Sequence, residues 1–237
     1  MRVLIVTAVP AERDAVTRAF GTGTTDPGAR PGAGDGTDPG TGTDRLARAG
    51  SYDVIAAGVG PPAAAAGTAT ALALGSYGLV VSAGIGGGFH AAPGSLLVAD
   101  AIVAADLGAE TPEGFVPVTG LGFGTVEHRP PADLVRAVAE ATGATPGTVL
   151  TASTVTGTAE RAAGLLAAHP GAVAEAMEGF GVAEAAAQAG VPVLEIRAVS
   201  NAVGPRDRDA WRIGDALAAL TTAFGKLAPV LEGWTRT

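Results

Sequence analysis

The sequence predicts an α/β fold, with one mainly parallel or mixed central sheet and helices on both of its faces. Apolar segments rich in Val, Ile and Leu alternate with Ala-rich segments of helical length along the 237-residue chain, which is the order typical of a largely parallel sheet. The strand segments are almost continuously apolar, as in strands that are covered on both faces. No repeat or boundary interrupts this order, so we expect a single domain over residues 1–237.

Each element follows from the local sequence. The chain begins with a strand at 2–9, and Pro10 then opens a helix that reaches about Phe20, because proline suits the first turn of a helix. Further helices are expected at 61–74, 131–143, 158–169 and about 207–232, and the segment 171–178 leads into another that reaches about Gln188. Further strands are expected at 51–60, 78–84, 95–106 (a bent strand or a strand pair), 148–153 and 191–199, whereas residues 107–130 are irregular.

Residues 21–44 fit no element. They are almost entirely Gly, Thr, Pro, Asp and Ala, without a large apolar side chain. Because such a segment cannot bury itself, we expect a mobile surface loop and assign it no function.

Charge and composition exclude several classes of function. The formal net charge is −8, Lys226 is the single lysine, and the arginines are scattered, so a nucleic-acid partner is not expected. The chain has no cysteine, which excludes disulfides, thiol nucleophiles and cysteine-bound metals. Residues 54–99 carry no Asp, Glu, Lys or Arg, but their recurring Gly and Pro do not suit a membrane span. The first apolar run is too short for a signal peptide, and we therefore expect a soluble cytoplasmic protein without a membrane partner.

Polar or Gly-rich residues follow the carboxyl ends of the expected strands, where parallel α/β folds bind their ligands. Glu12 follows the first strand, and Ser200–Asn201 follows the strand at 191–199. The other residues at these ends are the turn at 58–62, the glycine cluster at 84–88 and the pair Val155–Thr156. We expect all of them to converge on one rim of the sheet.

The sequence Gly-Val-Gly-Pro-Pro-Ala at 58–63 matches the glycine pattern of a dinucleotide-binding turn. However, no Asp or Glu lies between Asp53 and Asp100 to bind a ribose, and two prolines remove amide donors from the turn. We therefore expect no nicotinamide or flavin cofactor. The second cluster, Gly84 to Gly88, either keeps the backbone bare for a flat ligand or forms a tight turn that packs a helix on the sheet.

Two glutamates are candidates for chemistry, and each has a structural alternative. Glu178 lies among small apolar residues, where a carboxylate is costly unless it is paired. A sugar diol would satisfy its oxygens, and so would a salt bridge to a core arginine such as Arg197, which we expect to be structural. Glu12 stands at the rim, although acids are also common in the first turn of a helix because of its dipole.

Four stretches together resemble the nucleoside phosphorylase and nucleosidase superfamily, in particular its bacterial nucleosidases. They are VLIVTAVPAERDAV at the start, VVSAGIGGGF in the middle, and AVAEAMEGFGVAEAA and VPVLEIRAVSN near the end. The most specific parts are the Met177–Glu178 pair and the motif that ends at Asn201, whereas residues 21–44 and 107–150 lie outside the similarity. The resemblance implies the three-layer fold of the nucleoside phosphorylases, a small-molecule nucleoside substrate, and a homo-oligomer of two or more subunits. It implies protic chemistry that needs no cofactor and no metal.

The resemblance also assigns roles to residues. Glu12 matches the glutamate that positions and activates the attacking water, and Glu178 matches the glutamate that binds the ribose hydroxyls. Further residues are implied at the floor of the site, at the base edge, beneath the sugar and beside the asparagine: Ile85 and Gly86, Val155 and Thr156, Met177, and Ser200.

Asn201 departs from the adenine-releasing nucleosidases, which have an aspartate at this position that protonates purine N7. An amide offers a donor and an acceptor in fixed geometry, which suits a 6-oxopurine that presents O6 and N7. The 6-oxopurine phosphorylases of the superfamily use an asparagine in this role. We therefore expect hypoxanthine or guanine as the base, and not adenine.

The sequence favours hydrolysis over phosphorolysis. A phosphate site needs cationic or amide donors, yet no Arg or Lys lies between Ala49 and His128, a span that holds both Gly-rich turns. The alternatives are a 6-oxopurine nucleoside phosphorylase, another purine nucleosidase, and a catalytically silent nucleoside-binding module.

Within the superfamily, Asn201 and the segments DLGAE…EGF and SNAVGPRDRDAW resemble the futalosine hydrolases, which release hypoxanthine from futalosine in a route to menaquinone. The substrate of that family carries a carboxyphenyl ketone beyond C5′. The candidate contacts for this group are the apolar walls Phe89, Phe115, Phe123 and Phe180, and the cations Arg206 and Arg208. Ordinary packing or solvated charge explains each of them equally well.

Overall fold

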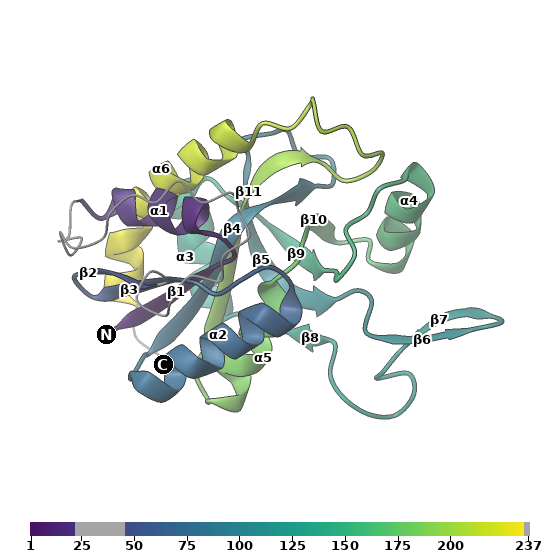
Figure 1. Ribbon diagram of the computed structural model, residues 1–237, viewed down its shortest axis with the longest axis horizontal. Coiled ribbons are helices and arrows are strands. Elements are labelled where there is room, and N and C mark those ends of the chain that lie inside the picture. Colours follow the sequence, from purple (N-terminus) through teal and green to yellow (C-terminus); the bar gives the residue numbers. More distant parts are fainter. Residues whose placement is uncertain (22–45, 235–237) are drawn as a thin grey trace.

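The computed structural model describes residues 1–21 and 46–234 and shows a central sheet with helices on both faces (Figure 1). The strands of this sheet are β1 (Val3–Thr7), β2 (Leu46–Ala49), β3 (Tyr52–Ala56), β4 (Leu79–Gly88), β5 (Leu96–Ala104), β8 (Glu127–His128), β9 (Thr145–Thr151), β10 (Ala172–Ala176) and β11 (Val193–Ala202). Their order is β10-β9-β5-β11-β4-β1-β3-β2, with β8 beside β5. Because β10 also pairs with β4, the strands β10, β9, β5, β11 and β4 close into a small barrel, and β1, β3 and β2 extend from it.

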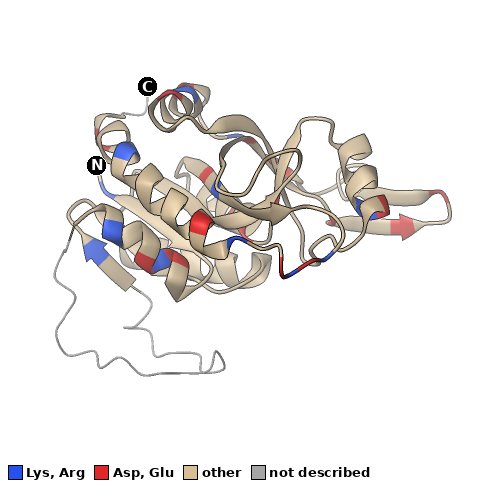
Figure 2. Cartoon of the chain, turned by 90° about the horizontal axis from the view of Figure 1, so that it is seen from above, with Lys and Arg blue, Asp and Glu red and all other residues tan. Residues whose placement is uncertain are grey.

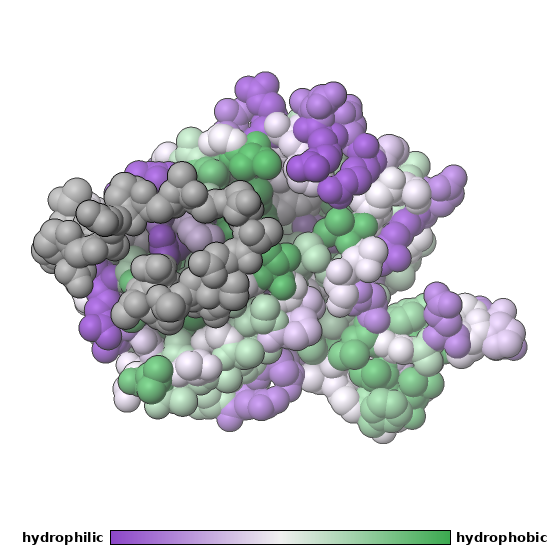
Figure 3. Space-filling view, in the orientation of Figure 1, coloured by the Kyte–Doolittle hydropathy of each residue, from purple (hydrophilic) through white to green (hydrophobic). Residues whose placement is uncertain are grey.

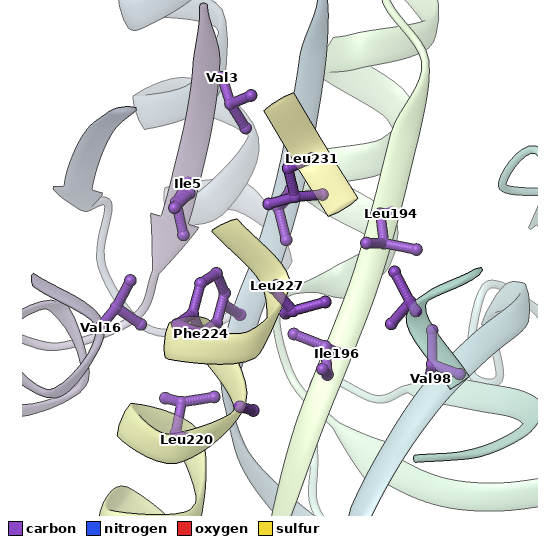
Figure 4. Packing of buried hydrophobic residues seen from close by; sticks show 14 of the residues in the cluster. Val3, Ile5, Val16, Val98, Leu194, Ile196, Leu220, Phe224, Leu227 and Leu231 are labelled. Atoms are coloured by element: carbon purple, nitrogen blue, oxygen red, sulfur yellow. The ribbon is translucent and has the colours of Figure 1, made fainter. Parts of the chain in front are cut away.

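Helices cover this sheet on two sides. They are α1 (Pro10–Ala19), α2 (Pro61–Leu74), α3 (Ala132–Thr142), α4 (Ala159–Ala168), α5 (Gly179–Gln188) and α6 (Ile213–Gly233). One hydrophobic cluster joins α1, α3 and α6 to the sheet, and a second joins α2 and α5 to the other face. Val3 and Ile5 of β1 point into the first cluster (Figure 4), whereas Leu4 and Val6 point into the second, because successive side chains of a strand face opposite sides.

The predicted fold class is confirmed. The sheet is mixed, since β1, β3, β4 and β11 run parallel while β5 runs antiparallel to β11. The first four helices lie within a residue or two of the predicted ranges, and α2 coincides with 61–74. The last helix begins only at Ile213 and not near 207, and the loop before it leads away from β11.

The glycine cluster at 84–88 is not a turn. It is the second half of β4, which pairs with β11 on one side and with β10 on the other. Of the two alternatives, the tight turn is therefore wrong, and glycine here serves close strand packing. A Cβ on Gly86 would lie 2.9 Å from the Glu175 carbonyl oxygen, and one on Gly88 would lie 2.9 Å from a methyl group of Val199.

The sequence pattern missed several strands. β10 occupies Ala172–Ala176, in a segment that was expected only to lead into a helix. The segment 107–130, expected to be irregular, contains β8 and a separate hairpin of β6 (Gly108–Thr111) and β7 (Gly114–Pro117) that projects from the body (Figure 1). β2 pairs antiparallel with β3 and was also not predicted. Apart from Gly21, the expected loop at 21–44 lies outside the described residues.

Charges are distributed as the sequence suggested. Figure 2 shows Lys and Arg interspersed with Asp and Glu rather than gathered in one stripe. In the part of the chain that the structure describes, no helix combines the length and the apolar character needed to cross a membrane.

Candidate active site

Glu12 is fixed at the junction of β1, α1 and β4. It lies in the first turn of α1, directly after the carboxyl end of β1, and its side chain is buried. One carboxylate oxygen accepts hydrogen bonds from the backbone N–H groups of Ala8 (2.9 Å) and Val9 (3.3 Å), and the other accepts one from Ile85 (2.8 Å). Burial raises the pKa of Glu12 above the ordinary value of 4.5, and the nearby charge of Arg197 opposes this only in part. Glu12 is therefore a well-oriented carboxylate with increased basicity.

Arg197 stands at the centre of the site and is 1% exposed. Its Nε donates to Glu195 Oε1 (2.8 Å), its Nη2 to Ser82 Oγ (2.9 Å) and its Nη1 to Glu178 Oε2 (3.4 Å). Glu12 interacts electrostatically with the same guanidinium. Three buried carboxyl groups thus surround one cation, and burial raises the pKa of Glu12 and of Glu195.

Gly84 explains how these groups come so close. A Cβ at this position would lie 2.6 Å from both Arg197 Nη1 and Glu12 Oε1. Any side chain would therefore separate the guanidinium from the carboxylate, and glycine leaves the necessary room.

Glu178 contacts both Arg197 and the first Gly-rich turn, residues 58–62. It precedes α5 as its N-cap residue, and its Oε1 accepts a hydrogen bond from the backbone N–H of Gly60 (3.2 Å). Gly60 has φ +87°, a conformation that favours glycine. The turn that resembled a dinucleotide motif thus donates a backbone hydrogen bond to a carboxylate of the protein itself. The ion pair with Arg197, weighed as the structural alternative for Glu178, is also present.

Ser200 and Asn201 lie within β11 rather than after it. The strand continues to Ala202, with a register shift between Val199 and Asn201. Ser200 Oγ lies 2.7 Å from Asn201 Oδ1 and 3.2 Å from the Gly86 carbonyl oxygen, and can donate to either. Asn201 Nδ2 donates to the Ala202 carbonyl (2.9 Å). The hydroxyl thus helps to fix the amide.

Thr156 is held by a glutamate that sequence reasoning missed. Its backbone N–H donates to Glu175 Oε2 (2.8 Å) and its Oγ1 donates to Glu175 Oε1 (2.5 Å). Both residues are buried, whereas the neighbouring Val155 is 36% exposed. Glu195 was missed as well, although its spacing from Arg197 in the strand offered a signal, because residues i and i+2 of a strand share a face.

Two of the aromatic candidates, Phe89 and Phe180, are buried in hydrophobic clusters. Phe89 is buried against Val103 and Leu150. Phe180 is buried in the cluster beneath α2 and α5, with its ring 5.2 Å from that of His128. Phe89 and Phe180 thus take part in core packing, and their place beside the substrate stays a prediction.

The remaining candidates for the 5′ group are on the surface. Phe115 is 48% and Phe123 is 62% exposed, and Figure 3 shows an apolar area beside the base of the β6–β7 hairpin. Arg206 and Arg208 lie over the ring of Trp211, at 5.2 and 5.8 Å from its centroid. Both arginines follow β11 in the chain, downstream of Asn201.

Among residues 1–21 and 46–234, no group of three or more His, Asp or Glu side chains is arranged to hold a metal ion. The carboxylates described above surround an arginine instead.

Known proteins are similar to this chain over nearly its whole length. Residues 2–231 match the model of the phosphorylase superfamily. A futalosine hydrolase from Streptomyces coelicolor is 66% identical over 99% of this chain and 98% of its own length. A second, from Acidothermus cellulolyticus, is 45% identical over 94% of this chain and 89% of its own length.

Solved structures share the fold at low sequence identity. A 5′-methylthioadenosine/S-adenosylhomocysteine nucleosidase from Colwellia psychrerythraea, in complex with adenine, has a TM-score of 0.74 at 22% identity, covering 98% of this chain and 95% of its own. A futalosine hydrolase of Helicobacter pylori has a TM-score of 0.75 at 16% identity, covering 99% and 98%. The chain therefore belongs to the phosphorylase superfamily and, within it, to the futalosine hydrolase family.

Proposed function

We propose that this chain hydrolyses the N-glycosidic bond of futalosine and releases hypoxanthine and dehypoxanthine futalosine, a step towards menaquinone. The observation that carries the proposal is Asn201, an amide fixed by Ser200 in the same row of the sheet as the glycine strand β4. An amide at this place suits a 6-oxopurine. The identity of 66% to a futalosine hydrolase over nearly the whole chain supports the same substrate.

Glu12 activates the attacking water in this proposal. Three backbone N–H groups orient its carboxylate, and its raised pKa makes it a stronger base than an exposed glutamate. It takes a proton from water while the water oxygen forms a bond to C1′. The bond between C1′ and the purine nitrogen breaks, its electron pair stays with the purine, and the released base takes a proton from solvent.

Glu178 binds the ribose hydroxyls, and Met177 lies beneath the sugar. Each carboxylate oxygen of Glu178 already accepts one hydrogen bond, from Gly60 or from Arg197. A carboxylate oxygen has two lone pairs, so each oxygen can accept one hydroxyl of a cis-diol without losing its protein partner.

Asn201 binds the base. One N–H of its amide donates to the Ala202 carbonyl, which leaves the second N–H for purine N7 or O6, where negative charge develops as the bond breaks. Main-chain groups of Val155 and the carbonyl oxygen of Thr156 hold the other edge of the base, since the Thr156 N–H already donates to Glu175. Ile85 and Gly86 form the floor.

The test is an incubation of the protein with futalosine, inosine and methylthioadenosine, with and without phosphate, followed by chromatography of the released base. We expect hypoxanthine from futalosine at a rate that does not depend on phosphate, and little or no adenine. Phosphate-dependent release would favour the phosphorylase alternative. Tight binding without release of base would favour a silent binding module.

The 5′ group and the assembly belong to the same proposal. Arg206 and Arg208 are the cations that we assign to the carboxylate of futalosine, since they lie together over Trp211 beyond β11. We expect a homo-oligomer of two or more subunits in the cytoplasm. The exposed apolar residues beside the hairpin, including Phe115 and Phe123, provide surface for such contacts, and light scattering would measure the mass.

A further inference from the structure

We propose that Glu175 is a positioning residue, which fixes the Val155–Thr156 segment so that its main-chain groups are set for the purine before the substrate arrives. The inference rests on the proposed function, because it concerns the base edge of that site. Glu175 touches no reacting atom and acts through Thr156.

The contact itself is unusually complete. One carboxylate oxygen of Glu175 accepts a hydrogen bond from the backbone N–H of Thr156 (2.8 Å), and the other accepts one from the Thr156 hydroxyl (2.5 Å). Glu175 is 5% and Thr156 is 8% exposed. Two hydrogen bonds to one residue fix its position and its orientation together, and a carboxylate is a strong acceptor for both.

The surroundings show why a loop needs this support. β9 ends at Thr151, and α4 begins only at Ala159, so Thr156 lies in the connection between them. Val155, which precedes Thr156, is 36% exposed. Without Glu175, Thr156 would keep no hydrogen bond among those found in the described part of the chain.

Glu175 is also built into the row of residues that holds Asn201. Gly87 of β4 pairs with Asn201 of β11 on one side and with Glu175 of β10 on the other. Neighbouring strands lie about 4.8 Å apart, so Asn201 and Glu175 stand roughly 10 Å from each other. Gly87, which carries no side chain, lies between the two in this row. The chain continues from Glu175 to Met177 and Glu178, so the same strand supports the base edge and the sugar side.

Four variants separate this role from simple stability. Glu175→Leu removes both acceptors, and Thr156→Val removes the hydroxyl but keeps the backbone N–H. Glu175→Gln is the conservative variant, because its carbonyl can accept from the backbone N–H and its amide can donate to the Thr156 hydroxyl, which also accepts. Thr156→Ser keeps both bonds. Thr68→Val is the matched control, since the Thr68 hydroxyl is buried and donates only within α2, to the Ala64 carbonyl.

The measurements are KM and kcat for futalosine, the inhibition constant of hypoxanthine, and hydrogen exchange of the peptide that contains residues 152–157. We expect Glu175→Leu to raise KM and the hypoxanthine inhibition constant about tenfold to a hundredfold, as a small misplacement of binding groups does. Thr156→Val should cause a smaller increase. The control Thr68→Val should stay within about threefold of the unmodified protein. Glu175→Gln and Thr156→Ser should recover most of the loss seen in Glu175→Leu and Thr156→Val, because they keep the contact. Exchange in the 152–157 peptide should accelerate in Glu175→Leu and Thr156→Val only.

Two results would overturn the inference while the proposed function stands. One is an unchanged hypoxanthine inhibition constant in folded Glu175→Leu. The other is unchanged exchange in the 152–157 peptide. If the unmodified protein releases no base from any purine nucleoside, the proposed function fails first, and the exchange measurement still decides whether Glu175 fixes the loop.

Discussion

Two clusters of buried charge lie at opposite ends of the same parallel strands, and they are built differently. At the amino ends, Asp53 of β3 binds Arg2 (2.8 Å) and Arg48 (3.7 Å) and accepts a hydrogen bond from the Tyr77 hydroxyl (2.6 Å). At the carboxyl ends, Arg197 is surrounded by three buried carboxylates. One cluster has more cations than anions, and the other has the reverse.

Solvent makes the contrast sharper. The side chains of Arg2 and Arg48 are 43% and 69% exposed, so water shares the charge of the Asp53 cluster. The side chains of Arg197 and Glu195 are 1% and 0% exposed, and Glu195 Oε2 is buried without a hydrogen-bond partner in the described structure. Burial of this kind disfavours the ionised form and raises the pKa of Glu195. Such an arrangement is typical of a site that needs a perturbed carboxylate, whereas the Asp53 cluster, whose arginines are exposed to water, needs only to hold strands together.

The largest expected difference between the two clusters is in catalysis. Glu12→Gln removes the base, and we expect kcat to fall by about 10²–10⁴-fold, while binding of hypoxanthine stays close to normal. Asp53→Asn removes a buried carboxylate of the other cluster and should leave kcat nearly unchanged. Steady-state kinetics with futalosine and titration with hypoxanthine measure both effects. Unchanged turnover in Glu12→Gln would remove Glu12 from the mechanism.

The pH profile gives an independent control for Glu12. The base acts only when it is ionised, so kcat/KM should fall about tenfold per pH unit below its pKa. Because burial raises this pKa, the acidic limb should lie above 4.5. The Asp53→Asn variant should show the same limb, and a limb at 4.5 or below would contradict the assignment.

The second expected difference is in stability. Arg197→Met leaves several buried carboxylates without their cation, which costs about 3–5 kcal/mol of the free energy of unfolding. Arg48→Met changes an exposed arginine and should cost about 1 kcal/mol or less. Urea unfolding of both variants at neutral pH measures the pair. Equal losses would show that the Arg197 cluster is no more dependent on its cation than a surface ion pair.

The sequence predicted where the polar residues of the site lie along the chain better than it predicted which residues they contact. Glu12, Ser200 and Asn201 could be placed because polar residues beside the carboxyl ends of apolar strands are visible locally. Glu175 could not be placed, because the residues of its strand are mostly Ala and Glu, which favour a helix. The segment forms β10 by pairing with β9 and β4, which come from other parts of the chain. The Gly84–Gly88 run was read as a possible turn for the same reason, since the strands and side chains that pass close to it come from distant parts of the chain.

A third and smaller expected effect is a change in which purine base the active site releases. Asn201→Asp replaces a neutral amide with a charge beside O6 of hypoxanthine, and an unmatched polar pair costs about 1–3 kcal/mol. We therefore expect hypoxanthine release from futalosine to slow by about tenfold to a hundredfold, and adenine release from methylthioadenosine to rise relative to it. Competition assays with both substrates measure the ratio. Ser200→Ala, which removes the hydroxyl next to the amide but keeps it neutral, should slow both substrates without changing their ratio, and an unchanged ratio in Asn201→Asp would contradict the role of the amide.

The smallest expected effect is a loss of stability at the amino ends of the strands. It depends on pH in the opposite sense to the activity, because it disappears at high pH and the activity disappears at low pH. Tyr77→Phe removes the hydrogen bond to Asp53 and should cost about 1 kcal/mol of stability with no change in kcat. Burial and the Asp53 hydrogen bond raise the pKa of Tyr77 from 10.0 to about 12. A raised pKa means that the tyrosine stabilises the fold fully below pH 10 and loses this contribution as pH rises towards 12. Thermal melts of both proteins from pH 7 to 11 should therefore converge only at the alkaline end, whereas activity is lost at the acidic end. A constant difference across this range would show that ionisation of the Tyr77 phenol does not remove its stabilising contact.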